Sequence, residues 1–251
     1  MGALRRHAPA VLAHLAVLAL WVWATSWGGV PRFILPGPLE TLRALGAPQI
    51  DWPHHLAVTA AEAFGGFALA VVIGVVLAVV FTWSAALRRG LMPLLVTLNL
   101  VPKVALAPLF IVWLGYGLVP NIAITFVISF FPIVITTARG LAEVEPELID
   151  LVRTVRATRW QVFRKIQLPS SLPYLFSGMR VAAVLAIAGT IVGEFVGSEA
   201  GLGFVIMSAQ GTLDTPVMMM SLIMVTLVGV TLYGVVVLLE RLVVTEDARL
   251  R

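Results

Sequence analysis

The chain is poor in the residues on which many enzymes and nucleotide-binding proteins depend. None of its 251 residues is cysteine, which excludes disulfides and thiolate metal sites. Only two lysines are present, Lys103 and Lys165, and neither follows a glycine, so the phosphate-binding loop G-x-x-x-x-G-K-[ST] is missing. If ATP drives this protein, another chain must therefore bind the nucleotide. The four histidines form no H-E-x-x-H pattern, and the adjacent His54 and His55 are expected at the surface rather than at a metal.

Charged residues are also scarce. They make up 12% of the chain, against roughly 25% in soluble domains, and 60% of the residues are hydrophobic. This composition indicates an all-α, polytopic membrane protein embedded in a lipid bilayer. A net charge of +4 would suggest a nucleic-acid partner in a soluble protein. Here the basic residues occupy short segments between apolar runs, where they set membrane orientation instead.

Six apolar runs are long enough to cross a bilayer. They cover residues 11–27, 56–83, 91–116, 121–138, 172–196 and 216–239. The first run could pass for a secretory signal, but its length and the membrane-spanning remainder favour an uncleaved helix. Three prolines, Pro93, Pro102 and Pro108, interrupt the third run. A short loop is expected at 85–90 and a small surface helix at 39–45.

These runs divide the chain into an N-terminal helix with an outer loop (1–55), a transmembrane core (56–245) and a charged tail (246–251). In two core helices small residues recur every four positions, which lets helix backbones approach closely in lipid. One stripe runs from Glu62 to Ala78 and the other from Gly178 to Glu194. The glycine-rich stretch between the last two runs is expected to form a tight outer turn or a re-entrant piece.

The longest polar segment, residues 143–173, separates the fourth and fifth runs. Apolar residues at helical spacing predict a helix over 147–156. Thr158 and Gln161 form a capping-box pattern, which predicts a second helix over 159–167 that ends at Pro169. Two helices joined by a sharp turn at 156–158 would project from the membrane. This arrangement favours docking to a cytoplasmic partner over a merely solvated loop.

The distribution of basic residues predicts which side of the membrane the polar segment faces. If the N-terminus is cytoplasmic, only Arg32 and Arg43 of the 17 Lys and Arg residues fall in outer segments, and Lys103 lies within a span. This asymmetry places both termini and the polar segment in the cytoplasm.

The polar segment resembles the EAA loop of ABC importer permeases, whose pattern is E-A-A-x3-G-x9-I-x-L-P. Residues 166–169 read I-Q-L-P and match the end of that pattern at the right spacing. Asp150, Leu151 and Val152 take the E-A-A positions. The glycine of the family falls on Arg156, although only glycine adopts a left-handed turn without cost.

Two further stretches resemble one branch of this family. PKVALAPLFIVWLGYG at 102–117 and VGEFVGSEAGLG at 192–203 are similar to permeases of the nitrate/sulfonate/taurine branch, which includes permeases for pyrimidine thiamin precursors and riboflavin. The resemblance covers about residues 35–245. It implies a type I importer fold with cytoplasmic coupling helices in a bacterial inner membrane. It also implies a permease homodimer, a periplasmic binding protein and two ATPase subunits that hold ATP and Mg. This chain itself would then be no enzyme and would bind no cofactor or metal.

The resemblance further implies that the projecting segment binds the ATPase, with residues 156–160 in a cleft of that subunit. The expected ATPase-coupling residues are Glu147, Asp150, Leu151, Val152, Arg153, Arg156, Ala157, Thr158, Arg159, Trp160 and Phe163.

Three ionisable residues, Glu62, Lys103 and Glu194, fall within the expected spans, where charge is costly and suggests function. One interpretation is that they line the translocation path between two permease copies. The other is that they form structural ion pairs or reach the membrane interface. One lysine against two glutamates indicates no clear anion-selective path. The resemblance implies a small organic or anionic solute, with most of the specificity set by the binding protein.

Two other classes of protein fit the composition less well. A secondary transporter or channel that works without ATP would predict internal repeats, and no convincing repeat is present. An intramembrane enzyme would need a catalytic constellation within the spans, and these contain no aspartate or suitably placed histidine.

Overall fold

The computed structural model describes residues 2–144, 152, 154 and 156–244, and its ordered elements in this part of the chain are all helical. The elements are α1 (Gly2–Ser26), α2 (Pro38–Arg43), η1 (Ala44–Gly46), α3 (Trp52–Trp83), α4 (Ala85–Leu100), η2 (Lys103–Leu106), α5 (Ala107–Leu114), α6 (Leu118–Ala142), α8 (Arg159–Val162), η3 (Phe163–Gln167), α9 (Leu168–Gly197), α10 (Leu202–Thr212) and α11 (Thr215–Val243). The expected all-α class is confirmed.

The described residues contain six candidate membrane crossings if one bent pair of helices counts as a single crossing. Five helical stretches, in α1, α3, α6, α8–α9 and α11, are long and apolar enough to span a bilayer. The sixth crossing consists of α4 and the η2–α5 stretch, which meet at an angle of 85°. The break coincides with Pro102, whose ring and missing N–H end α4. Pro93, in contrast, lies inside α4.

Two expected boundaries were wrong. The loop over 85–90 is absent because Ser84 caps a new helix: its hydroxyl accepts a hydrogen bond from the Leu87 N–H at 3.3 Å, and α4 begins at Ala85. The helix expected from residue 56 begins four residues earlier, at Trp52, after the Asp51 cap. The small helix near 39–45 is present as α2 and η1.

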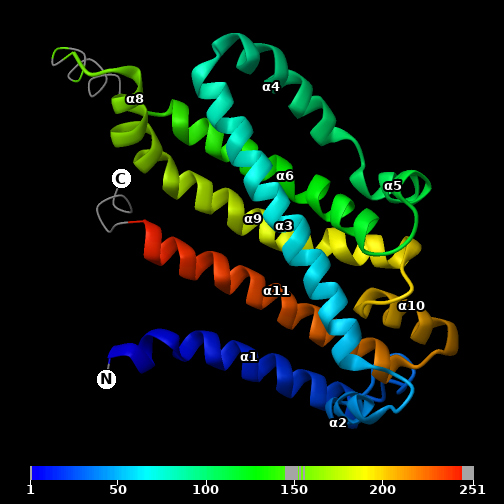
Figure 1. Cartoon of the computed structure of the whole chain (residues 1–251). Helices are drawn as coiled ribbons and strands as arrows, with labels where there is room; N and C mark the ends of the chain where they lie inside the picture. The colour runs from blue at the N-terminus through cyan, green and yellow to red at the C-terminus, as the bar shows by residue number, and fades with distance from the viewer. Residues whose placement is uncertain (1, 145–151, 153, 155, 245–251) are drawn as a thin grey trace.

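The centre of the bundle is α6, which packs between α3 and α9 (Figure 1). Both small-residue stripes are buried at these two contacts. A Cβ atom on Gly66 of α3 would lie 2.5 Å from Thr125 of α6, so only glycine permits that approach. The hydroxyl of the same Thr125 lies 2.9 Å from the Thr190 hydroxyl and links α6 to α9.

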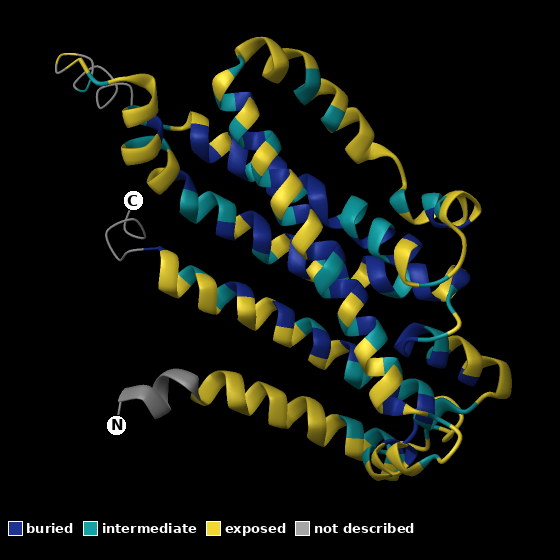
Figure 2. Cartoon of the chain, viewed as in Figure 1, coloured by how far each residue is buried: buried dark blue, intermediate teal, exposed yellow. Residues whose placement is uncertain are grey.

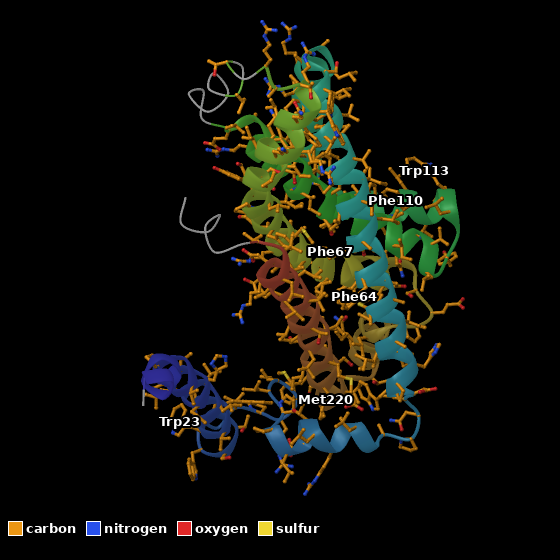
Figure 3. The ribbon with its side chains drawn as sticks, turned by 60° about the vertical axis from the view of Figure 1, so that its left-hand side comes forward. Trp23, Phe64, Phe67, Phe110, Trp113 and Met220 are labelled. Atoms are coloured by element: carbon orange, nitrogen blue, oxygen red, sulfur yellow. The ribbon has the colours of Figure 1, made fainter. Side chains whose placement is uncertain are left out.

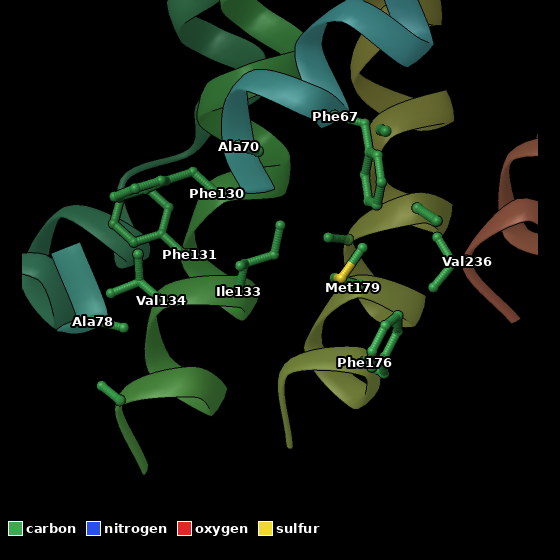
Figure 4. Close-up of a cluster of buried hydrophobic side chains, with 14 of the residues drawn as sticks. Phe67, Ala70, Ala78, Phe130, Phe131, Ile133, Val134, Phe176, Met179 and Val236 are labelled. Atoms are coloured by element: carbon green, nitrogen blue, oxygen red, sulfur yellow. The ribbon is translucent and has the colours of Figure 1, made fainter. Parts of the chain in front are cut away.

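The main core cluster fills the space between these helices. Phe67 of α3, Phe131 and Ile133 of α6, and Met179 of α9 are buried in it, and Val236 brings α11 against the same cluster (Figure 4). In contrast, α4 has no buried residue, and α1 is exposed along most of its described side chains (Figure 2). Trp23 on α1 and Trp113 on α5 lie at the periphery (Figure 3). These exposed faces are largely apolar, as surfaces in contact with lipid are.

The two ends of the bundle differ in what they carry. The start of α1, the end of α11 and α8 lie at one end, while α2, α5 and α10 lie at the other (Figure 1). Both ends of the described chain therefore lie on the same side as the polar segment. After the roles expected from the sequence, we call the first the coupling end and the second the outer end.

Candidate coupling segment and buried carboxyl pair

The turn of the polar segment has left-handed geometry at Arg156, where φ is 53°. Val152 and Thr154 before it are helical, and the Ala157 N–H donates to the Val152 carbonyl at 3.1 Å. A six-to-one hydrogen bond around a left-handed residue is the Schellman ending of a helix, in which glycine is favoured. The chain thus keeps the turn of the family pattern with arginine in the position of its glycine.

Four of the expected coupling residues, Glu147, Asp150, Leu151 and Arg153, lie outside the described residues. The expected helix over 147–156 can therefore be compared with the structure only at its end. The remaining seven expected residues belong to the turn and to the helices on either side of it.

The capping box predicted from the sequence is confirmed. The Thr158 N–H donates to Oε1 of Gln161 at 2.8 Å, and the Gln161 N–H donates to the Thr158 hydroxyl at 3.3 Å. The two reciprocal bonds satisfy backbone groups that the first turn of α8 would otherwise leave unpaired. They fix the direction in which the chain leaves the turn.

The prediction that Pro169 ends the second helix was wrong, because the chain remains helical from Arg159 to Gly197. Just before the proline, residues Phe163–Gln167 form a π-helix, in which the Leu168 N–H donates to the Phe163 carbonyl. The wider π turn accommodates a residue that lacks an N–H and would clash with the carbonyl of a regular α-helix. The polar segment is therefore continuous with the membrane helix α9.

An aromatic cluster attaches the segment to α3. Phe163 is buried, and its ring lies 5.7 Å from the rings of both Trp83 and Trp160, measured between centroids. The Trp83 and Trp160 rings are 6.2 Å apart. Such tilted and stacked pairs stabilise contacts beyond their buried area. Trp83 was not predicted from the sequence, because one of seven tryptophans near span ends carries no distinguishing signal.

The exposure of the expected coupling residues divides them into two groups. Arg156, Thr158, Arg159 and Trp160 are exposed, and Trp160 retains 57% of its accessible surface despite its ring contacts. Phe163 retains only 7%. The exposed side chains are available to a partner, whereas Phe163 holds the segment in place.

A short ion pair marks the beginning of the polar segment. Nε of Arg139 lies 3.1 Å from Oε2 of Glu143. The guanidinium group of Arg139 lowers the pKa of the Glu143 carboxyl, so Glu143 stays ionised at neutral pH. Nearby, the Gln167 amide donates to the Leu141 carbonyl at 3.4 Å and ties η3 to the end of α6.

At the outer end, the structure brings Glu62 of α3 and Glu194 of α9 together. They retain 0% and 2% of their accessible surface, and the two buried carboxyl groups interact electrostatically with each other. The Asn121 amide of α6 donates to Oε1 of Glu62 at 2.8 Å, and the Thr59 hydroxyl donates to Oε1 of Glu194 at 2.5 Å. No cation among the described residues forms an ion pair with either glutamate, so the expected structural ion pair with lysine is not the arrangement found.

The same cluster receives the first turn of α10. The Gly203 N–H donates to Oε2 of Glu194, and the Leu202 N–H donates to the Thr59 hydroxyl at 2.8 Å. The Gly201 N–H donates to Nδ1 of His55 at 3.1 Å. The glycine-rich stretch therefore folds back as a short helix, consistent with the expected re-entrant piece, and His55 is half-buried rather than a free surface residue.

Lys103, the third intramembrane ionisable residue, lies apart from the two glutamates. It lies at the break between α4 and η2, where its ammonium group donates to the carbonyl and to Oδ1 of Asn99, both at 2.8 Å. The ammonium group also lies 5.0 Å from the centre of the Phe131 ring. Lysine commonly pairs with the free carbonyls at a helix end in this way. Lys103 remains partly exposed, unlike the two glutamates.

Thr59 and Asn121 could not be singled out from the sequence. Each is one of several polar residues in an apolar helix and carries no spacing pattern of its own. Only their contacts with Glu194 and Glu62 distinguish them. No group of three or more His, Asp or Glu side chains in the described part of the chain could hold a metal ion.

The described part of the chain is thus a bundle of candidate membrane-spanning helices with a short helical segment projecting at one end. The model of the family "Binding-protein-dependent transport system inner membrane component" matches residues 70–245, and the chain belongs to this family. It is therefore the multi-pass inner-membrane permease subunit of a binding-protein-dependent ABC importer for small solutes. ATP is hydrolysed by a separate ABC ATPase in the same complex.

Several relatives are similar over most of the chain. The riboflavin transport system permease protein RibX of Chloroflexus aurantiacus is 37% identical over 93% of this chain and 88% of its own length. The formylaminopyrimidine transport permease protein ThiX of Halalkalibacterium halodurans is 34% identical over 77% of both chains. A putative aliphatic sulfonates transport permease protein, SsuC of Escherichia coli, is 31% identical over 91% of this chain and 88% of its own.

The fold is similar to that of a solved transporter. An inward-facing structure of the MetNI methionine ABC transporter contains a chain that superposes with a TM-score of 0.59 and 24% identity, over 85% of this chain and 97% of that one. This likeness confirms the expected type I importer fold.

Proposed function

We propose that the polar segment, residues 143–173, is the contact through which an ABC ATPase drives this permease. The observation that carries the proposal is the exposed turn of Arg156 to Trp160, which is attached to the membrane helices at two points. One attachment is the buried Phe163, packed on Trp83 at the end of α3. The other is the unbroken helix from Arg159 into α9. A force on the turn would therefore act directly on two core helices.

The charges of the turn suit a partner with acidic groups. Arg156 and Arg159 are both exposed, and arginine pairs readily with carboxylates in a planar two-bond geometry. Trp160 supplies an exposed aromatic surface beside them, and tryptophan and arginine are the residues that most often anchor interfaces. The whole assembly would contain two copies of this chain, two ATPase subunits and a periplasmic solute-binding protein. Both termini and the coupling end would then lie in the cytoplasm.

The three intramembrane ionisable residues differ in whether they could line a translocation path. Glu62 and Glu194 are buried inside one copy, so in this conformation they face no path between copies. Lys103 is partly exposed at the break of the α4–α5 crossing, and we assign a path role to it alone.

The relatives' names refer to riboflavin, formylaminopyrimidine and sulfonates. A small organic or anionic solute, delivered by the binding protein, is the class we propose for this chain.

The substitution Arg159→Glu tests the coupling role. We expect it to weaken ATPase binding and to abolish most transport-coupled ATP hydrolysis, because it places like charges at the interface. Arg241→Glu is the matched control, since Arg241 is an exposed arginine on α11 near the same end. The measurements are co-purification with the ATPase and solute-stimulated hydrolysis in liposomes. Normal coupling in Arg159→Glu would contradict the proposal, and solute transport without ATP would favour a secondary transporter or channel instead.

A further inference from the structure

The hydrogen bonds of the two buried glutamates are unequal. Each oxygen of Glu194 has a protein donor, the Thr59 hydroxyl for Oε1 and the Gly203 N–H for Oε2. Oε1 of Glu62 accepts from the Asn121 amide, but Oε2 of Glu62 has no donor among the described residues. A buried carboxyl oxygen without a donor is costly unless it carries a hydrogen itself.

Two neighbouring carboxylates without a cation cannot both be ionised in a buried site. The position of Glu194 favours its ionised form. Its carboxyl group lies at the N-terminal end of α10, where the helix dipole and free N–H groups stabilise negative charge. Glu62 has no such set of donors, since only the Asn121 amide reaches it.

We propose that Glu62 and Glu194 share one proton, carried on Oε2 of Glu62, and that the ionised Glu194 thereby fixes the first turn of α10 at the outer end. In this arrangement Glu62 donates to Glu194, and Glu194 accepts from three groups. Both glutamates are positioning residues, because neither needs to touch the solute.

The glycines of the re-entrant helix agree with this assignment. A Cβ atom on Gly203 would lie 2.7 Å from Oε2 of Glu194, so a larger residue could not bring its N–H so close. Gly201 has φ of 107°, a conformation that residues with a side chain rarely adopt. The stretch GSEAGLG is thus shaped to fit its backbone around a carboxylate.

The pair also joins the two helices that reach the coupling segment. Glu62 lies in the outer half of α3 and Trp83 at its other end, and Glu194 lies at the far end of the helix that continues from Phe163. The next step rests on the proposed function. The shared proton holds α3, α9 and α10 together at the outer end, while the ATPase acts on α3 and α9 at the coupling end. A cavity of about 250 Å³, lined by Glu194, Tyr116 and Phe204, opens beside the pair.

The test compares Glu62→Gln with Glu194→Gln in the whole transporter reconstituted in liposomes. Glutamine at 62 can donate to Glu194 and still accept from Asn121, so thermal stability and transport should remain near those of the unsubstituted protein. Glutamine at 194 presents an N–H group where an acceptor is needed. Because a hydrogen bond to a charged group contributes about 1.5–3 kcal/mol, transport should fall by about tenfold or more.

Infrared difference spectroscopy measures the protonation of the carboxyl groups directly, which a purely structural role of Glu62 would not affect. The carbonyl band of a buried protonated carboxyl should disappear in Glu62→Gln. The band can be measured whether or not the ATPase couples, so it separates failure of this proposal from failure of the proposed function. If Glu194→Gln fails to fold, the Glu62→Gln spectrum still decides the question. The proposal is overturned if the band persists in Glu62→Gln, or if Glu62→Gln is as damaging as Glu194→Gln.

Discussion

At the scale of single residues, Arg156 shows how the chain departs from a family pattern without losing its geometry. An L-residue in the left-handed conformation costs roughly 1–2 kcal/mol relative to glycine. Arg156 nevertheless adopts φ of 53°, with the Schellman hydrogen bond formed around it. The surrounding structure, chiefly the capping box of Thr158 and Gln161, stabilises the turn enough to offset this cost.

Two substitutions at Arg156 should have different effects. Arg156→Gly should stabilise the turn by about 1 kcal/mol, since glycine adopts the conformation freely, but it should weaken ATPase coupling in part, because it removes one of the two arginines proposed to contact the ATPase. Arg156→Val should impair coupling, because a β-branched side chain fits a left-handed backbone poorly. Solute-stimulated ATP hydrolysis and thermal unfolding would measure both. Unchanged coupling in Arg156→Gly would instead show that the arginine side chain at this position makes no contact with the ATPase.

At the scale of helices, close approach between backbones decides the packing around α6. Gly66 of α3 lies against Thr125 of α6, and Gly178 of α9 lies against Thr136 of α6, so both neighbouring helices approach α6 closely. Without a hydrophobic driving force in lipid, such contact and the hydrogen bonds across it hold the helices together. The bend between α4 and α5, in contrast, follows from local chain chemistry at Pro102.

Gly66→Ala should lower stability by about 1–3 kcal/mol, because its Cβ would overlap Thr125 and force the two helices apart. Gly234→Ala is the control. Gly234 is exposed on α11, and no atom of another residue lies within 4 Å of the position that a Cβ would take there, so alanine should stabilise the helix by about 0.5–1 kcal/mol. Thermal unfolding in detergent compares them. Equal midpoints for the two variants would contradict the packing described at α6.

At the scale of the whole molecule, two long helices connect the functional ends. The coupling turn lies at one end of α3 and α9, and the buried carboxyl pair lies towards the other. The basic residues, of which only Arg32 and Arg43 fall in expected outer segments, predict that the coupling end faces the cytoplasm.

Because the chain contains no cysteine, single cysteines can report that orientation without background. A membrane-impermeant maleimide should label Glu199→Cys in intact spheroplasts but Arg164→Cys only after permeabilisation, since both sites are exposed and lie at opposite ends. Ala70→Cys, fully buried in the core, is the unlabelled control. Labelling of Arg164→Cys in intact spheroplasts would reverse the assignment of the cytoplasmic side.

Much of this protein could be predicted from sequence patterns that are local. The six crossings follow from apolar runs, the buried stripes from small residues every four positions, and the capping box from Thr158 and Gln161. The predicted end of the second coupling helix failed at Pro169, since the π turn that accommodates a proline leaves no pattern in the residues before it.

By itself, then, the sequence determined the helical class, the number of crossings, the family and the polar segment that projects from the bundle, because each depends on composition or on residues close together in the chain. Only the tertiary structure decided what the intramembrane charges do. Glu62 and Glu194 are 132 positions apart in the chain, and their contact, with Thr59, Asn121 and the turn of α10, arises when α3, α6 and α9 pack together. Burial without a cation then turns two apparent path residues into a pair that must share a proton.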